Sequence, residues 1–374
     1  MSANKKFEKI GVNPAFLENE QAESKGQDTR RKVNVYSFRK ATPKKKREKQ
    51  YEIGFINVYI LFSVCFVLCI FNNILSDEGF YNGFLSYGGY IARCSAYFII
   101  FIIPSLLYCK LKKDAGFGLL GVRRFSSSYT PFIILSLLLM AFVIAAEKFA
   151  LAYFFSAGMS GEQVVLINNP DKLWVIIAYA VVPSICEELL LRGILQNEIS
   201  RIAGGASGII VSALAFALIH LDAQYFIIYF SSGLILAVTM HVCSSVIPCI
   251  FVHLLNNLFS LCFSSQLTFI ASERVGNLLI LIILTACIFI ISLFWIKNLE
   301  ILCIRKAASV EISLKCDEDD VSQKKPSNDG KTISFYSVPF TLMSDTGYTF
   351  HKFLRVLFSP TIIISVIIFL FATL

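Results

Sequence analysis

Long apolar stretches separated by short polar segments make up most of the chain beyond residue 50. Eight of them begin at about residues 55, 88, 130, 173, 207, 225, 246 and 276, and a ninth runs from about 353 to 374. Most approach the roughly 20 residues that a helix needs to cross a bilayer. Because backbone polar groups in lipid must be satisfied internally, the pattern predicts an all-α fold, a polytopic transmembrane helix bundle of about 8–9 spans.

Basic residues are concentrated outside these stretches. The formal net charge is +8, and the polar first 50 residues are crowded with lysine and arginine. A second basic segment follows the second apolar stretch and contains Lys110, Lys112, Lys113, Arg123 and Arg124. Short basic loops stay in the cytoplasm. We therefore expect an integral membrane protein with a cytoplasmic N-terminus, and we interpret the basic tail as an orientation signal and not as a nucleic-acid-binding arm.

The composition along the chain suggests five regions. They are a basic disordered cytoplasmic tail (1–50), N-terminal membrane spans (51–165), a catalytic membrane core with the span that follows it (166–297), a polar cytoplasmic insert (298–352) and a C-terminal membrane span (353–374).

The fourth apolar stretch contains two adjacent carboxylates, Glu187 and Glu188, followed by Arg192. Ionisable groups at membrane depth cost several kcal/mol, so their presence favours a functional site. Glu188 and Arg192 are spaced i, i+4 and can form an ion pair along one helix. This spacing predicts that Glu188 and Arg192 support the site, whereas Glu187 stays available to act on a water molecule or a metal.

Two of the four histidines lie in apolar surroundings and can meet these carboxylates. Glu187 lies 17 residues before Gly204, and His220 lies 16 residues after it. If the turn is centred between Ala203 and Gly204, the two offsets are equal, and both residues lie at equal depth in an antiparallel helix pair. His253 and Asn257 are four residues apart and share one helix face. The set therefore suits a hydrolase, in which Glu187 and His220 activate water while His253 and Asn257 stabilise an oxyanion.

Three motifs resemble those of a known family. Glu187-Glu188-x-x-x-Arg192, Phe216-x-x-x-His220 and His253-x-x-x-Asn257 occur in this order on three separate predicted spans. They resemble the motifs of the CAAX prenyl protease and bacteriocin-processing (CPBP or Abi) family of intramembrane proteases, over about residues 170–265. The resemblance implies a multi-helix bundle with a polar cavity on the cytosolic side. It also implies Glu187 as catalytic base with His220 as its partner, and His253 with Asn257 as oxyanion stabilisers.

Several alternatives remain open at this point. A zinc-dependent protease would use Glu187, His220 and His253 as ligands with water in the fourth position. However, the sequence contains no His-Glu-x-x-His motif, and we expect no cofactor. Cys186 is a weak thiol candidate because it points about 100° away from Glu187 on a helix. A non-catalytic immunity or scaffold protein, or a proton-coupled carrier, would also be a membrane bundle. The expected partners are the lipid bilayer and a peptide, prenylated or membrane-protein substrate, with no nucleic acid; the substrate itself is not determined.

Overall fold

The structure is a computed structural model that describes residues 44–77, 79–83, 87–112, 116–155, 171–272, 274–323 and 353–373. The first 43 residues of the predicted basic tail and residues 324–352 of the predicted polar insert lie outside this range. The chain divides into two units, and the membrane helices belong to the unit formed by residues 44–314 and 339–374. Of the other unit, the structure describes only residues 315–323, which are helical.

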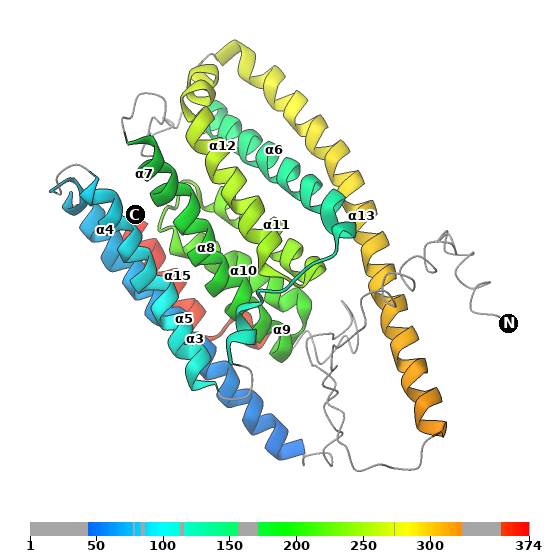
Figure 1. Ribbon diagram of the computed structural model, residues 1–374. Helices are drawn as coiled ribbons and strands as arrows, with labels where there is room; N and C mark the ends of the chain where they lie inside the picture. The colour runs from blue at the N-terminus through cyan, green and yellow to red at the C-terminus, as the bar shows by residue number, and fades with distance from the viewer. Residues whose placement is uncertain are drawn as a thin grey trace. The chain divides into compact units, whose positions relative to one another are not determined.

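The described residues form helices joined by turns, with no strand among them (Figure 1). The main helices are α3 (Lys44–Asp77), α4 (Gly88–Tyr97), α5 (Ile103–Leu111), α6 (Thr130–Phe155), α7 (Lys172–Ile176), α8 (Val182–Glu188), α9 (Asn197–Ala203), α10 (Gly205–Ile219), α11 (Phe226–Cys243), α12 (Val246–Ser272), α13 (Arg274–Gln323) and α15 (Pro360–Thr373). The predicted all-α fold is therefore confirmed.

Seven helical segments within the described residues are long and apolar enough to cross a membrane. They are Asn57–Ser76, Gly88–Leu111, Ser127–Leu151, Lys172–Ala203, Phe226–Cys243, Val246–Phe263 and Leu278–Arg305. Two shorter apolar helices, α10 and α15, occupy the other two positions where the sequence predicts a span. The chain is thus an integral membrane protein, and the expected number of spans is approximately right.

Helix α10 is short because the chain leaves the helical path just after Ile219. Leu221 adopts a left-handed conformation with φ 50°, and the Asp222 side chain then accepts a hydrogen bond from the backbone N–H of Tyr225. Fifteen residues at 1.5 Å each make a helix of about 22 Å, less than the roughly 30 Å of the hydrocarbon core. The interruption predicted at Asp222 therefore ends a short helix, with His220 at its C-terminal end.

The segment that carries the glutamates lies in the middle of the packed core. It runs from α8 through a π-helical segment, η6 (Leu189–Gln196), and contacts α10, α11 and α12. Seven of the eight residues of η6 are buried, and Arg192 is among the largest fully buried side chains of the described residues. Gly193 permits one close approach, because a Cβ at this position would lie 2.6 Å from the carbonyl oxygen of Leu120.

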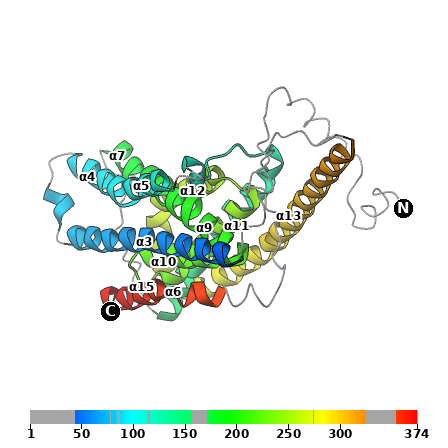
Figure 2. The same cartoon turned by 90° about the horizontal axis from the view of Figure 1, so that it is seen from below.

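Helices α13 and α15 pack against the outside of this core. Trp295 of α13 stacks on Phe132 of α6 and donates a hydrogen bond to Ser136 Oγ at 2.8 Å. Helix α15 lies beside α3 and α10, which Figure 2 shows from below. Helix α13 continues past the predicted end of its span at residue 297, so residues 298–323 of the predicted insert are helical.

Candidate active site

Two π-helical segments flank the glutamate pair. The segment η5 (Ile177–Val181) directly precedes α8, and η6 directly follows it. Pro183 lies in the first turn of α8 and has no backbone N–H to donate to the preceding turn, so the helix widens just before it. The same pattern occurs at Pro104, which follows the π-helical segment η2 (Phe98–Ile102). Single π-helical turns within α-helices are frequent at functional sites.

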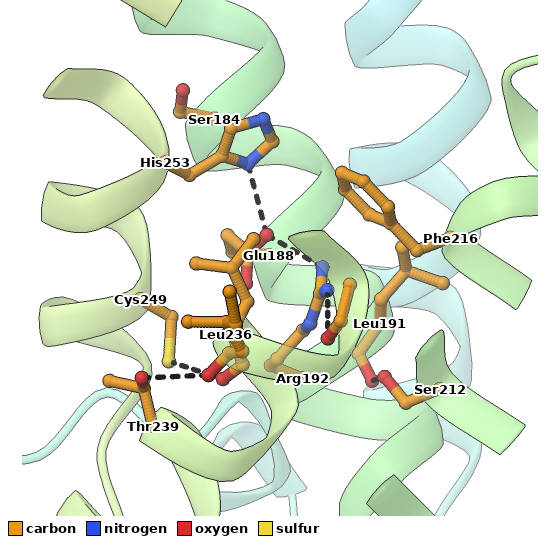
Figure 3. Close-up of polar contacts among 12 residues, drawn as sticks. Ser184, Glu188, Leu191, Arg192, Ser212, Phe216, Leu236, Thr239, Cys249 and His253 are labelled. Carbon is orange, nitrogen blue, oxygen red and sulfur yellow. Dashed lines mark hydrogen bonds and ion pairs between the residues drawn. The ribbon is translucent and has the colours of Figure 1, made fainter. Parts of the chain in front are cut away.

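Glu188 is the centre of a buried ionic cluster. Arg192 Nη1 donates to Glu188 Oε1 at 2.6 Å, and both side chains have 0% exposure. The other guanidinium nitrogen, Nη2, donates to the backbone carbonyl of Gly233 on α11 at 3.1 Å. The ion pair expected from the i, i+4 spacing is therefore present. Arg192 also connects this helix to α11, and Figure 3 shows the guanidinium between the two.

His253 is the second partner of Glu188. Its Nδ1 lies 3.0 Å from Glu188 Oε1, across the interface between α12 and α8. A carboxylate paired with Arg192 can only accept, so Nδ1 carries the hydrogen and Nε2 faces away from Glu188. The sequence predicts a role for His253 at the oxyanion and does not predict a contact with Glu188. The structure adds that Glu188 orients its ring.

Asn257 is held one turn away by Ser184. The Asn257 amide nitrogen, Nδ2, lies 3.3 Å from Ser184 Oγ, and Ser184 Oγ donates to the carbonyl of Ala180 at 2.7 Å. Ser184 is fully buried, with 0% exposure. Sequence reasoning did not identify this serine, although its i, i+4 spacing to Glu188 mirrors that of Asn257 to His253.

His220 is fixed by its neighbours at the end of α10. Its Nδ1 lies 2.7 Å from the carbonyl oxygen of Phe216, and its ring stacks on Tyr229 of α11 with 3.9 Å between the ring centroids. A backbone carbonyl only accepts hydrogen bonds, so Nδ1 carries the hydrogen here too. The other nitrogen, Nε2, is then a free acceptor whenever the imidazole is neutral.

The Phe216 ring contacts side chains from three parts of the site. Its ring lies 4.7 Å from the His220 ring and 5.5 Å from the His253 ring, centroid to centroid. The Arg192 guanidinium carbon lies 4.5 Å from the same ring centroid, within cation–π range. Residues from η6, α10 and α12 therefore meet at one aromatic side chain.

Glu187 differs from Glu188 in its surroundings. It is 4% exposed, and its Oε2 has no hydrogen-bond partner. Glu187 lies within electrostatic range of His253 and of Tyr229, the residue on which His220 stacks. No hydrogen bond joins Glu187 to His220. Within the described residues, Glu188 thus has two partners at Oε1, and Glu187 has none; Oε2 is without a partner in both glutamates.

The predicted zinc alternative requires three ligands in one place. Within the described residues, no group of three or more His, Cys, Asp or Glu side chains is arranged to hold a metal ion. Of the three proposed ligands, His253 instead contacts Glu188, whose carboxylate also pairs with Arg192.

Comparison with known protein families adds an independent observation. Residues 169–259 match the family model described as type II CAAX prenyl endopeptidase Rce1-like. This segment is Rce1-like. It covers about a quarter of the 374 residues and includes the six site residues Glu187, Glu188, Arg192, His220, His253 and Asn257. The resemblance to CAAX prenyl proteases is confirmed for this segment, and the matched family is one of proteases. Comparisons with curated proteins and with solved structures gave no match.

Proposed function

We propose that this protein is an intramembrane endopeptidase that uses Glu187 and His220 to activate water. The observation that carries the proposal is that the two adjacent glutamates differ in their hydrogen-bond and ion-pair partners. Glu188 Oε1 is engaged by both Arg192 and His253, whereas Glu187 forms no hydrogen bond or ion pair with a described residue at either oxygen in the same buried site; Oε2 of both glutamates lacks a partner. A carboxylate without a partner in the protein can accept a hydrogen bond, and then a proton, from a water molecule.

The proposed reaction proceeds in two proton transfers. Glu187 accepts a proton from water, and the water oxygen bonds to the carbonyl carbon of the substrate's peptide bond. His220 positions that water through Nε2, because its Nδ1–H is already donated to the Phe216 carbonyl. Glu187 then delivers the proton to the amine nitrogen as the carbon–nitrogen bond breaks. As this bond breaks the carbonyl re-forms, and the products are a carboxylic acid, which then ionises to a carboxylate, and a new amine, with no covalent enzyme intermediate.

His253 and Asn257 would stabilise the oxyanion that forms between these transfers. Nδ1 of His253 donates to Glu188, so Nε2 can donate to an oxyanion only when the ring carries its second proton. The Glu188 carboxylate stabilises this imidazolium. Asn257 contributes an amide N–H from the same helix face. Donors of this kind typically supply about 3–4 kcal/mol each in transition-state stabilisation.

We propose a membrane-associated or lipidated substrate that is cleaved near its C-terminus or leader, because the matched family acts on CAAX prenyl proteins. We also propose that the N-terminus is cytoplasmic. Lys112 at the end of α5 forms an ion pair with Glu198 of α9, which places the basic loop at the same end of the bundle as the Gly204 turn. A basic end of this kind faces the cytoplasm.

The experiment that tests the proposal compares the membrane peptides of wild-type cells with those of cells carrying Glu187→Ala. Uncleaved precursors should accumulate in the variant, while the variant protein reaches the membrane in normal amounts. His253→Ala and Asn257→Ala should accumulate the same precursors. Full processing in both Glu187→Ala and His253→Ala cells would instead favour a non-catalytic scaffold or immunity protein.

A further inference from the structure

The contact between Ser184 and Asn257 repeats the geometry of the contact between Glu188 and His253. Both contacts cross the interface between α8 and α12, at 3.3 Å and 3.0 Å. A step of four residues from Glu188 back to Ser184 matches a step of four from His253 forward to Asn257. This is the register of two antiparallel helices in contact, since residues four apart lie on one helix face. Two polar rungs therefore join the helices, and each rung contains one candidate oxyanion donor.

The hydrogen-bond polarity of Ser184 decides which end of the Asn257 side chain faces it. A serine hydroxyl has one hydrogen, and Ser184 donates it to the Ala180 carbonyl at 2.7 Å. Only the oxygen lone pairs remain for Asn257. The carboxamide must therefore present its NH2 group to Ser184 and not its carbonyl oxygen. One of the two amide hydrogens of Asn257 is used in this contact. The second remains available to another acceptor.

We propose that Ser184 is the positioning residue of Asn257, holding the carboxamide with its free N–H toward the substrate carbonyl. This inference rests on the peptidase function proposed above. Without Ser184, the carboxamide can rotate by half a turn and present its oxygen, which would repel an oxyanion. The two candidate donors are thus oriented in parallel ways, His253 by a carboxylate and Asn257 by a hydroxyl, from one face of α8.

The surroundings of Ser184 separate this role from simple packing. Ser184 is fully buried, and its Ala180 partner lies in the π-helical segment η5 just before Pro183. A matched control exists in Ser207 of α10, which is 1% exposed and donates to the carbonyl of Ala203, four residues earlier, at 2.8 Å. Ser207 makes the same bond to a carbonyl four residues earlier, across the Gly204 turn to the last residue of α9, and no hydrogen bond joins it to Asn257.

The experiment measures turnover by purified full-length protein in lipid vesicles. The probe is the precursor peptide that accumulates most strongly in Glu187→Ala membranes. Ser184→Ala should lower kcat about 10–100-fold with KM nearly unchanged, because the donor acts on the transition state. Ser207→Ala should leave both constants near wild type. The double variant Ser184→Ala with Asn257→Ala should be no slower than Asn257→Ala alone, because the serine acts only through the asparagine.

Ser184→Thr distinguishes the hydrogen-bonding role from a packing role. Threonine keeps the hydroxyl and its bond to the carbonyl four residues earlier, but it adds a methyl group to a filled site. Positioning through the hydroxyl predicts that Ser184→Thr is more active than Ser184→Ala. A packing role predicts the reverse order.

Two further outcomes would overturn the positioning role of Ser184, and a third would overturn the proposed function as well. Wild-type kcat in Ser184→Ala, or a double variant slower than Asn257→Ala by the full effect of the serine change, overturns the positioning role while leaving the peptidase intact. If Glu187→Ala membranes accumulate no precursor at all, the proposed function fails and this inference fails with it.

Discussion

Replacing Arg192 by leucine should be among the most destabilising single changes in the described core. Its guanidinium and the Glu188 carboxylate are both 0% exposed and 2.6 Å apart, and Arg192 also donates to Gly233. Removing one partner of a buried ion pair leaves an uncompensated charge and costs about 3–5 kcal/mol. In Arg192→Leu, His253 is the only remaining partner of Glu188 Oε1. We expect a loss of this size in the free energy of unfolding.

Removing both charges should restore much of the stability. The double variant Glu188→Leu with Arg192→Leu removes both charges of this ion pair, and its remaining cost is the lost acceptor of His253 Nδ1, about 1–3 kcal/mol. The suitable assay is unfolding of the purified protein by sodium dodecyl sulfate in mixed micelles. It gives the free energy of each variant relative to wild type.

A control for the Arg192 prediction lies further along the same span. Arg201 pairs with Glu198 at 2.9 Å, but it is 27% exposed, and Glu198 keeps Lys112 as a partner. Arg201→Leu should therefore cost only about 0–1 kcal/mol. The reasoning is refuted if Arg192→Leu costs no more than Arg201→Leu, or if the double variant is less stable than Arg192→Leu alone.

Three further predictions concern the backbone, the histidine and the metal. Gly193→Ala should destabilise the protein by about 1–3 kcal/mol in the unfolding assay, because the new Cβ meets the Leu120 carbonyl. Gly83 has open space around it, so Gly83→Ala should be neutral in the same assay. Glu188→Gln should lower kcat at least tenfold, because a neutral amide holds the His253 imidazolium less well; an unchanged kcat would show that Glu188 does not act through that ring. Exhaustive chelation should leave the activity of the purified protein unchanged, and activity lost on chelation and restored by Zn²⁺ would establish the zinc alternative.

The hydrophobic pattern predicted the helices well because membrane depth constrains length and composition together. Each predicted apolar stretch corresponds to an apolar helix among the described residues. The turn expected between Ala203 and Gly204 is present, with Gly204 at φ 92°. The end of α10 was left open by the sequence. It depends on the left-handed Leu221, a conformation that leucine rarely adopts and that no residue pattern announces.

The candidate site could be predicted only where one helix contains both partners. The Glu188–Arg192 pair follows from i, i+4 spacing and is present. The bond from His253 to Glu188 was not predicted, because it depends on the register between α8 and α12. One signal was available: Ser184 and Glu188 have the same spacing as His253 and Asn257, so one antiparallel register satisfies both pairs.

The π-helical segments η5 and η6 were not predicted from the sequence. Pro183 accounts for η5, because a proline inside a long helix removes a backbone hydrogen bond. We found no comparable signal for η6, whose eight residues include no proline. Two of its residues, Arg192 and Gln196, donate hydrogen bonds to backbone carbonyls of α11.

The most direct test of the central claim is cleavage by purified protein. Wild type and Glu187→Ala, each reconstituted in lipid vesicles and verified by its unfolding profile, would be incubated with the precursor that accumulates in Glu187→Ala membranes. Mass spectrometry would follow the new carboxylate and the new amine. The account predicts cleavage by the wild type and none by a folded Glu187→Ala protein. Cleavage at the wild-type rate by folded Glu187→Ala would contradict it.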